Sequence, residues 1–472
     1  MHFLRPLLRK SSLNWIILVA ALALAAPRVA HAEALLVVEA DTGKVLQADN
    51  ATYPWYPASV TKLMTAYVTL KAVKDGRLSL DTLLTVSPVA AAQSPSKMGF
   101  RPGTQVTVDN ALKMMLVKSA NDMAVVLAEG VGGSIDGFSA QMNQAAQRLG
   151  MTQTSYVNPN GLPADGQITS ARDLAILARA IIHDLPEYEY FVHIPAIRFG
   201  RKVTQNFNKL IGRYPGADGF KTGFICASGY NLVASATRNG KRLIAVVLGS
   251  SSGQMRAVRA AQLLERGFAN NNLSWLRPSL GTVDNLVPID ASPPNLHDEM
   301  CGPRHKRPAS DEDEDIIASG SNSGESALTF FAAGLQPPMV KPSELLAGAA
   351  APSEPIPVYT GPTRTGAALI AAVAADVENQ TPQRHGKNKK SRVAAKKPDA
   401  AAEPNAAGKS DGKDAKSEPA ARHANAAPKA AEKPVATTDA KPAKPKAAAK
   451  RPAKPAPRTG EAKPADQKAP HS

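Results

Sequence analysis

Three short motifs carry the side chains that could do chemistry in this chain of 472 residues. They occur in the order Ser59-Val60-Thr61-Lys62, Ser119-Ala120-Asn121 and Lys221-Thr222-Gly223. Together they supply a hydroxyl nucleophile, an amine base one helical turn further on, a second hydroxyl that can relay a proton, and a cationic strand edge. Such a set can carry out acyl transfer without a histidine. Each motif is too short to be specific alone, so the prediction depends on all three in this order.

The first motif is distinguished by its context. Ser-x-x-Lys also begins at Ser94, in a loop broken by proline, and at Ser410, in a polar tail. Ser59 instead opens an apolar stretch that predicts a buried helix, which places Lys62 one turn on along the same face. Lys62 must be neutral to accept the serine proton, and burial together with a second cation such as Lys221 would lower its pKa. The alternative is a capping serine followed by a solvated lysine.

The other two motifs also have structural alternatives. Ser119-Ala120-Asn121 falls at a predicted junction between helices, where a hydroxyl and a carboxamide can face a cleft or merely cap a helix. Lys221-Thr222-Gly223 occurs once, just before a predicted hairpin, and suits an edge strand. There Gly223 would let a substrate main chain approach closely, whereas the alternative is a plain turn that leads into a strand.

Strands at both ends of the motif-bearing stretch enclose a helical middle. Residues 34–39 and 44–48 form one predicted hairpin, and residues 230–238 and 241–248 form another around Asn239-Gly240. The predicted helices are 59–70, one capped by Asp109, 122–129 ending at Gly130, 139–149 closed by Gly150, 170–182 and 254–268. The pattern predicts an α+β fold with an antiparallel sheet, flanking helices and a helical subdomain. A cleft between the sheet and the subdomain would hold the motifs.

Composition divides the chain into four parts. Residues 1–32 have a basic start, an apolar run from Trp15 to Ala26 and an Ala30-His31-Ala32 end, which predicts a signal peptide and an exported protein, with an uncleaved anchor as the alternative. Residues 33–270 are the predicted catalytic domain. Residues 271–380 resemble a linker, with one short strand at Thr282–Ile289 and an Ala-rich helix at residues 365–377. Residues 381–472 are predicted to be a disordered basic tail.

The distribution of charge limits the classes of binding partner, and the two cysteines allow one disulfide. Of the net charge of +16, a balance of +13 lies between Arg384 and Ser472, with 22 Lys and Arg against 9 Asp and Glu. Because the protein is predicted to be exported, the tail favours anionic envelope polymers or a membrane surface over nucleic acid, or acts only as a solvated extension. Cys226 and Cys301 could pair in an oxidising compartment, although the loop-like setting of Cys301 argues against this. No residue spacing predicts a metal site or a cofactor.

Residues from about Glu33 to Asn270 resemble the penicillin-binding D-alanyl-D-alanine carboxypeptidases, serine-type peptidases of the bacterial envelope. The resemblance extends to Tyr56-Pro57-Ala58-Ser59, Ser119-Ala120-Asn121-Asp122, the Asn158–Gly161 turn, Ser170-Ala171-Arg172-Asp173 and Gly229-Tyr230-Asn231-Leu232-Val233. It implies a β-lactamase/transpeptidase-like fold. It also implies removal of the terminal D-alanine from peptidoglycan stem pentapeptides through an acyl-enzyme, with β-lactams such as penicillin as inhibitors.

The resemblance also implies a role for each motif residue. These roles are Ser59 as acylated nucleophile, Lys62 as general base, Ser119 as proton relay, Asn121 as substrate-amide contact, Lys221 as electrostatic support, Thr222 and Gly223 as substrate contacts, the backbone N–H groups of Ser59 and Phe224 as oxyanion hole, and Arg256 as second carboxylate contact. Two features depart from the family. Phe224 stands where some members have histidine, and a linker-like basic stretch replaces the usual β-rich second domain and amphipathic anchor.

Other functions remain as alternatives. A DD-endopeptidase that cuts peptidoglycan cross-links would use the same residues. A β-lactamase would need a carboxylate that holds a water, and no Glu-x-x-Leu-Asn stretch follows Ser119. Gly249-Ser250-Ser251-Ser252-Gly253 matches the nucleophile elbow of α/β-hydrolases, but the acid and histidine on a continuing sheet are missing. A non-catalytic cell-wall binding protein that acts through its tail is the remaining class.

Overall fold

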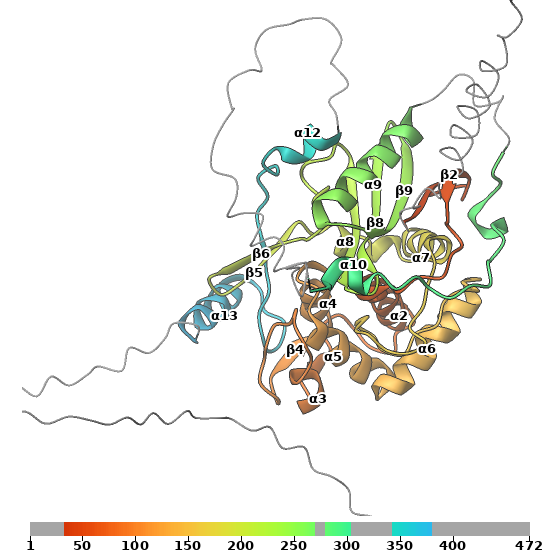
Figure 1. Cartoon of the computed structure of the whole chain (residues 1–472). Coiled ribbons are helices and arrows are strands. Elements are labelled where there is room, and N and C mark those ends of the chain that lie inside the picture. Colours follow the sequence, from red (N-terminus) through yellow and green to blue (C-terminus); the bar gives the residue numbers. More distant parts are fainter. Residues whose placement is uncertain (1–32, 270–278, 304–341, 380–472) are drawn as a thin grey trace, which may run out of the picture. The chain divides into compact units, whose positions relative to one another are not determined.

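A five-stranded antiparallel sheet forms the centre of the fold (Figure 1). The structure is a computed structural model that describes residues 33–269, 279–303 and 342–379. The strand order is β2 (Val45–Asp49), β1 (Ala34–Glu39), β9 (Lys241–Ser250), β8 (Gly229–Arg238) and β7 (Ala217–Ile225). The antiparallel sheet and both predicted hairpins are therefore confirmed. The predicted signal peptide and basic tail lie outside the described residues.

The central strands are apolar throughout because both faces of the sheet are covered. On β1, Val37 packs with α9 (Gly253–Phe268), whereas Leu36 and Val38 join the cluster that contains α7 (Ala171–Asp184). Successive side chains of a strand point to opposite faces, so each strand contributes to both cores. The predicted helices at 170–182 and 254–268 are thus the two helices that cover the sheet.

Helices make up most of the second part of the fold, which lies below the sheet in Figure 1. Its elements are α2 (Lys62–Lys74), the short α3 (Pro88–Ala91), α4 (Val108–Val117), α5 (Asn121–Gly132), α6 (Ile135–Arg148) and the strand pair β3 (Leu83–Thr85) and β4 (Gln105–Thr107). Every residue of α5 from Asn121 to Ala128 is buried, which is typical of a helix enclosed by its neighbours. These neighbours are α2, α3, α4 and α6.

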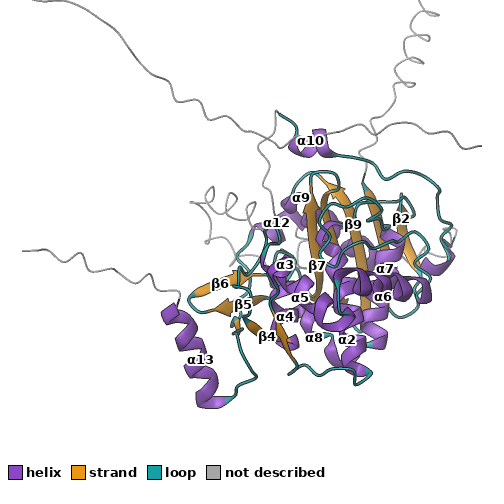
Figure 2. Ribbon diagram, turned by 90° about the horizontal axis from the view of Figure 1, so that it is seen from below, coloured by secondary structure: helices purple, strands orange, loops and turns teal. Residues whose placement is uncertain are grey.

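The remaining elements, most of them short, lie around these two parts (Figure 2). They are the 3-10 helices η1 (Ala58–Thr61), η2 (Pro186–Tyr188) and η4 (Val283–Asn285), the helices α8 (Tyr190–His193), α10 (His297–Cys301), α12 (Pro342–Ala347) and α13 (Gly366–Asn379), and the small sheet of β10 (Ile356–Pro357), β5 (Ala196–Phe199) and β6 (Lys202–Gln205). The Ala-rich helix predicted at 365–377 is confirmed as α13. Among the described residues, no helix combines the length and apolar character needed to cross a bilayer.

Several predicted helix ends were wrong. Helix α2 begins at Lys62 and runs to Lys74 instead of residue 70, and α6 begins at Ile135 instead of residue 139. The cap of α4 is Thr107, whose extended backbone lets its hydroxyl accept from the Asn110 N–H, while Asp109 sits inside the first turn. An acidic side chain there favours the helix through the dipole without capping it. Helix α5 continues past Gly130 to Gly132, and its C-cap Gly133 takes a left-handed conformation with φ of 74°. Glycine adopts that conformation without steric cost.

The predicted strand at Thr282–Ile289 is also wrong. Thr282 makes only an isolated bridge with Lys44, and the chain then turns into η4. The main-chain oxygen of Asp284 accepts from Arg172 on α7, so this stretch is held by side chains of a helix and not by a sheet.

Cys226 and Cys301 form a disulfide, which corrects the expectation that Cys301 would stay apart from Cys226. Their Cα atoms lie 5.6 Å apart across a sequence separation of 75 residues. The Leu296 N–H donates to the Ala227 carbonyl at 3.0 Å, and the side chain of Met300 is buried. These contacts dock α10 against the turn that follows β7, although the sequence around Cys301 resembles a loop.

Candidate active site

Ser59 lies in η1, immediately before α2. The residue before it, Ala58, has φ of 49°, a left-handed conformation that costs energy outside glycine and persists only where neighbours enforce it. Asn231 on β8 provides part of this constraint, because its amide donates to the carbonyls of Tyr56 at 3.0 Å and Pro57 at 3.2 Å. The sheet thus fixes the segment that presents the Ser59 hydroxyl.

The amine of Lys62 lies 2.8 Å from Ser59 Oγ, as the Ser-x-x-Lys spacing predicts. It also donates to Asn121 Oδ1 at 2.7 Å and to the main-chain oxygen of Asn160 at 2.6 Å, inside a fully buried environment. Three separate parts of the chain therefore meet at this nitrogen. The sequence indicated the turn from residue 158 to 161 but not that the Asn160 carbonyl belongs to the site.

The chemistry of these partners fits a neutral amine. The amide Oδ1 of Asn121 and the carbonyl of Asn160 can only accept hydrogen bonds, whereas the Ser59 hydroxyl can donate or accept. A neutral lysine has two N–H bonds and one lone pair. The same three contacts suit an ammonium, which would donate to all three oxygens. In the neutral form, both N–H bonds can go to the two obligate acceptors, which leaves the lone pair for Ser59, the arrangement that a general base needs.

Asn121 is held in the required orientation by a loop. Its Nδ2 donates to the Ser94 carbonyl at 2.9 Å, so its Oδ1 faces Lys62, and its main-chain N–H donates to the Ser96 carbonyl at 2.8 Å. Two residues earlier, Ser119 is buried and has φ of 61°. Left-handed non-glycine residues thus occur at Ala58, immediately before the first motif, and at Ser119, within the second. Backbone strain of this kind clusters at functional sites.

The third motif lies on the edge strand β7, as predicted. A Cβ atom added to Gly223 would lie 2.8 Å from the Ser59 nitrogen and 3.0 Å from the Val60 nitrogen, so only glycine allows β7 to approach η1 this closely. Lys221 and Thr222 are buried beside it. The next residue, Phe224, stacks on Tyr230 of β8 at a ring distance of 4.2 Å.

Arg256 approaches the same strand from α9. Its buried guanidinium contacts the main-chain oxygens of Gly223 and Phe207, each at 3.4 Å. It also lies 5.5 Å from the centre of the Tyr230 ring. The structure thus places Arg256 next to the predicted substrate strand, and its contact with a carboxylate stays a prediction.

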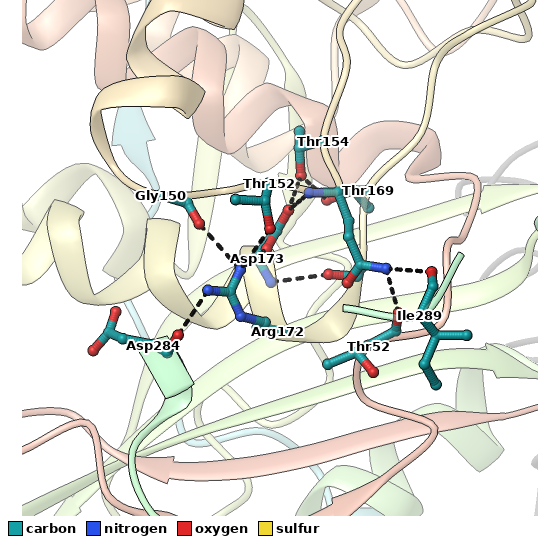
Figure 3. Close-up of polar contacts among 11 residues, drawn as sticks. Thr52, Gly150, Thr152, Thr154, Thr169, Arg172, Asp173, Asp284 and Ile289 are labelled. Carbon is teal, nitrogen blue, oxygen red and sulfur yellow. Dashed lines mark hydrogen bonds and ion pairs between the residues drawn. The ribbon is translucent and has the colours of Figure 1, made fainter. Parts of the chain in front are cut away.

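A second buried polar cluster surrounds the Ser170-Ala171-Arg172-Asp173 motif (Figure 3). Arg172 donates to Asp173 Oδ1 at 2.7 Å, to the Gly150 carbonyl at 3.0 Å and to the Asp284 carbonyl at 2.9 Å. Burial raises the pKa of Asp173, and hydrogen bonds from Thr154, the Gln153 N–H and Arg172 only partly oppose this. The cluster connects α7 to three loops and contains none of the predicted catalytic residues.

Two of the three serines in the Gly249–Gly253 stretch have structural roles, and no contact among the described residues assigns one to the central Ser251. Ser250 Oγ donates to the Glu33 carboxylate at 2.9 Å, and Ser252 caps α9 by accepting from the Met255 N–H at 3.1 Å. Within residues 33–269, 279–303 and 342–379, no three His, Cys, Asp or Glu side chains group in a way that could hold a metal ion.

Comparison with known proteins identifies the family of the chain. The family model described as D-alanyl-D-alanine carboxypeptidase matches residues 21–252. D-alanyl-D-alanine carboxypeptidase DacB2 of Mycobacterium tuberculosis is 34% identical over 250 residues, which cover 51% of this chain and 83% of that protein. The chain belongs to the D-alanyl-D-alanine carboxypeptidase family.

Two further proteins match about half of the chain. DacC of Escherichia coli is 40% identical over 251 residues, which cover 52% of this chain and 62% of DacC. The chain therefore spans less than two thirds of the length of this relative. The crystal structure of penicillin-binding protein 6B from Escherichia coli aligns with 36% identity and a TM-score of 0.49, and covers 52% of this chain and 79% of that chain.

Proposed function

We propose that this protein is a serine-type D-alanyl-D-alanine carboxypeptidase that removes the terminal D-alanine from peptidoglycan stem pentapeptides. The observation that carries the proposal is the 2.8 Å contact between Ser59 Oγ and the buried Lys62 amine. Membership of the D-alanyl-D-alanine carboxypeptidase family supports the substrate class. The buried setting supports the chemistry, because loss of water favours the uncharged form of an amine.

In the acylation step, Ser59 Oγ attacks the carbonyl carbon of the penultimate D-alanine while its proton moves to Lys62 Nζ. A C–O bond forms, and the N–H groups of Ser59 and Phe224 stabilise the negative oxygen of the tetrahedral intermediate. When the C–N bond breaks, the proton passes from Lys62 through Ser119 to the leaving amine. Water then hydrolyses the ester by the reverse proton path and frees Ser59.

The remaining motif residues bind the substrate. Asn121 holds the substrate amide, Lys221 supplies positive charge, and Thr222 binds the terminal carboxylate. Arg256 is the proposed second contact of that carboxylate, which requires its guanidinium to turn away from the main-chain oxygens that it now contacts. A β-lactam would acylate Ser59 in the same way and leave slowly, which makes it an inhibitor.

We also propose that the protein is exported and acts in the periplasm or cell envelope. The signal-peptide pattern of residues 1–32 supports this proposal, as does the disulfide, which is stable in an oxidising compartment. The basic tail would contact anionic envelope polymers or a membrane surface. Residues 33–270 would form the catalytic domain and residues 381–472 the tail. The stretch between them would belong partly to the domain, because its α10 and β10 are attached there by the disulfide and by pairing with β5.

Trapping with penicillin tests the proposed function. Wild-type protein, Ser59→Ala and the control Ser94→Ala are incubated with penicillin, and the adduct is measured by intact mass and mapped to its peptide. We expect one adduct on the Ser59 peptide in wild type and Ser94→Ala, and none in Ser59→Ala. An adduct on another serine, or none in the wild type, contradicts the proposal.

The substrate class needs a second assay. Released D-alanine is measured with a muropeptide that carries a pentapeptide stem, and cleavage of a cross-linked muropeptide dimer is measured in parallel. We expect the monomer to be the better substrate. Faster cleavage of the dimer would identify an endopeptidase instead.

A further inference from the structure

The loop from Gln93 to Gly99 contacts both obligate acceptors of the Lys62 amine. Ser94 accepts from Asn121 through its main-chain oxygen, as described above. The neighbouring residue, Gln93, reaches the other acceptor residue, since Asn160 Nδ2 donates to Gln93 Oε1 at 2.8 Å. Two consecutive residues of one loop therefore contact the two parts of the chain that position Lys62.

The Asn160 side chain is constrained at both ends. Its Oδ1 accepts from the Leu162 N–H at 3.1 Å, while its Nδ2 donates to Gln93. The following residue, Gly161, has φ of 81°, and a Cβ there would lie 1.8 Å from the Ala58 carbonyl oxygen. The peptide that carries the Asn160 carbonyl is thus pressed against the segment before Ser59. A small rotation of this peptide would move the carbonyl off the Lys62 amine.

Gln93 is itself held in one orientation. Its Nε2 donates to the Val89 carbonyl of α3 at 3.2 Å, so Oε1 is the atom that faces Asn160. The other end of the loop is fixed by Asp122 on α5, which accepts from the Met98 and Gly99 N–H groups at 3.1 and 2.9 Å. The loop therefore acts as a rigid support between α3 and α5.

We propose that Gln93 is a positioning residue that orients the Asn160 carbonyl and thereby keeps the Lys62 amine directed at Ser59. This inference rests on the proposed function of Ser59 and Lys62. It predicts that Gln93 affects how fast the base accepts the serine proton, since a base must lie within hydrogen-bond reach of that proton. Binding of the substrate should change little.

The test measures the second-order rate of acylation by a fluorescent penicillin as a function of pH, with kcat and KM for a peptide that ends in D-Ala-D-Ala. The variants are Gln93→Ala, which loses the acceptor, and Gln93→Glu, which keeps it. The matched control is Gln47→Ala, whose side chain bonds only Asp49 among the described contacts and lies on β2. The titratable groups of the loop and of the motifs around this site, namely Lys97, Lys118, Asp122 and Lys221, are the same in all variants.

We expect Gln93→Ala to lower the acylation rate and kcat about tenfold, the rate equivalent of one hydrogen bond, with KM nearly unchanged. Gln93→Glu should retain most of the rate at high pH and shift the pH midpoint of acylation upward, because a carboxylate near Lys62 favours the ammonium form. In an Asn160→Ala background, Gln93→Ala should cause no further loss, since both changes break the same contact.

A role of Gln93 in folding alone would give a different result. The melting temperature of Gln93→Ala would fall, but its acylation rate would match that of the Gln47→Ala control. The pH midpoint of Gln93→Glu would match the control as well. This outcome overturns the proposal. Additive losses in the double variant overturn it as well. Absence of any penicillin adduct in the wild type rejects the proposed function, whereas normal acylation of both wild type and Gln93→Ala rejects only the role of Gln93.

Discussion

Two of the buried basic side chains in the described residues, Arg172 and Lys62, lie in very different surroundings. Arg172 donates to the carboxylate of Asp173 and to main-chain carbonyls, whereas the hydrogen bonds of Lys62 described above go to three neutral oxygens. A carboxylate partner favours the charged form of a cation, and arginine keeps its proton in any case. Neutral partners together with burial allow lysine to release its proton. The first cluster can therefore stabilise the fold, and the second can do acid–base chemistry.

The largest effect is expected for Lys62→Arg, which tests whether Lys62 acts as a base or only through its charge. Arginine retains the positive charge but cannot act as a base, so we expect the acylation rate by penicillin to fall about a thousandfold, within the range for loss of a general base. The protein should remain folded by circular dichroism. Acylation at more than a tenth of the wild-type rate would show that Lys62 acts only through its charge.

The segment from residue 279 to 303 runs from the Arg172 cluster to the end of β7, the strand that carries the third motif. Its disulfide provides the next test. Asp284 accepts from Arg172, and Cys301 is bonded to Cys226, the residue after β7. For a loop of this length, the chain-entropy model gives a loss of about 4 kcal/mol of unfolding free energy on removal of the bond. The double variant Cys226→Ser/Cys301→Ser should show this loss in denaturant titrations, with its folded form acylated at close to the wild-type rate.

Reduction of the disulfide in the wild type is the control for its removal by mutation. A phosphine reductant should lower the stability of the wild type and leave the double variant unchanged. The double variant could instead keep its stability but lose acylation. That result would mean that the disulfide positions β7. The two clusters would then be more closely coupled than their hydrogen bonds indicate.

Arg172→Lys examines the structural cluster. An ammonium group cannot reach Gly150, Asp173 and Asp284 together as a guanidinium does, so at least one buried acceptor loses its partner. We expect a loss of about 2 kcal/mol of unfolding free energy, with no change in acylation per folded molecule. The matched control is Arg77→Lys, which makes the same change at an exposed arginine. A selective loss of acylation in Arg172→Lys would contradict the division between the clusters.

Sequence patterns predicted the parts of this molecule that depend on local signals. The hairpin at Asn239-Gly240 requires positive φ at two residues, and the pairing of Ser59 with Lys62 follows from one helical turn. The Asn160 carbonyl was missed because any residue can present a main-chain oxygen, so its type gives no signal. The disulfide was missed because contacts of α10, and not the sequence near Cys301, bring the two cysteines together.

A third cluster, partly exposed, should have the smallest effect. Glu189 interacts with His193 and with Arg242 of β9. Burial alone would raise the pKa of Glu189, but the hydrogen bond from His193 and the charge of Arg242 outweigh it and lower the pKa below its ordinary value of 4.5. The charged form is thus favoured by folding, so its contribution to stability is present above pH 4.5 and is lost as the pH falls through the lowered pKa.

Glu189→Gln should therefore lower the unfolding free energy by about 1 kcal/mol or less at pH 7, the size typical of partly exposed ion pairs. The difference from wild type should shrink as the pH falls below 4.5 and respond to salt, because solvent screens such pairs. Thermal unfolding at several pH values and two salt concentrations measures both trends. If the difference in unfolding free energy stays constant with pH, Glu189 acts through packing. If it is as large as that of Arg172→Lys, burial does not determine how much these ion pairs contribute to stability.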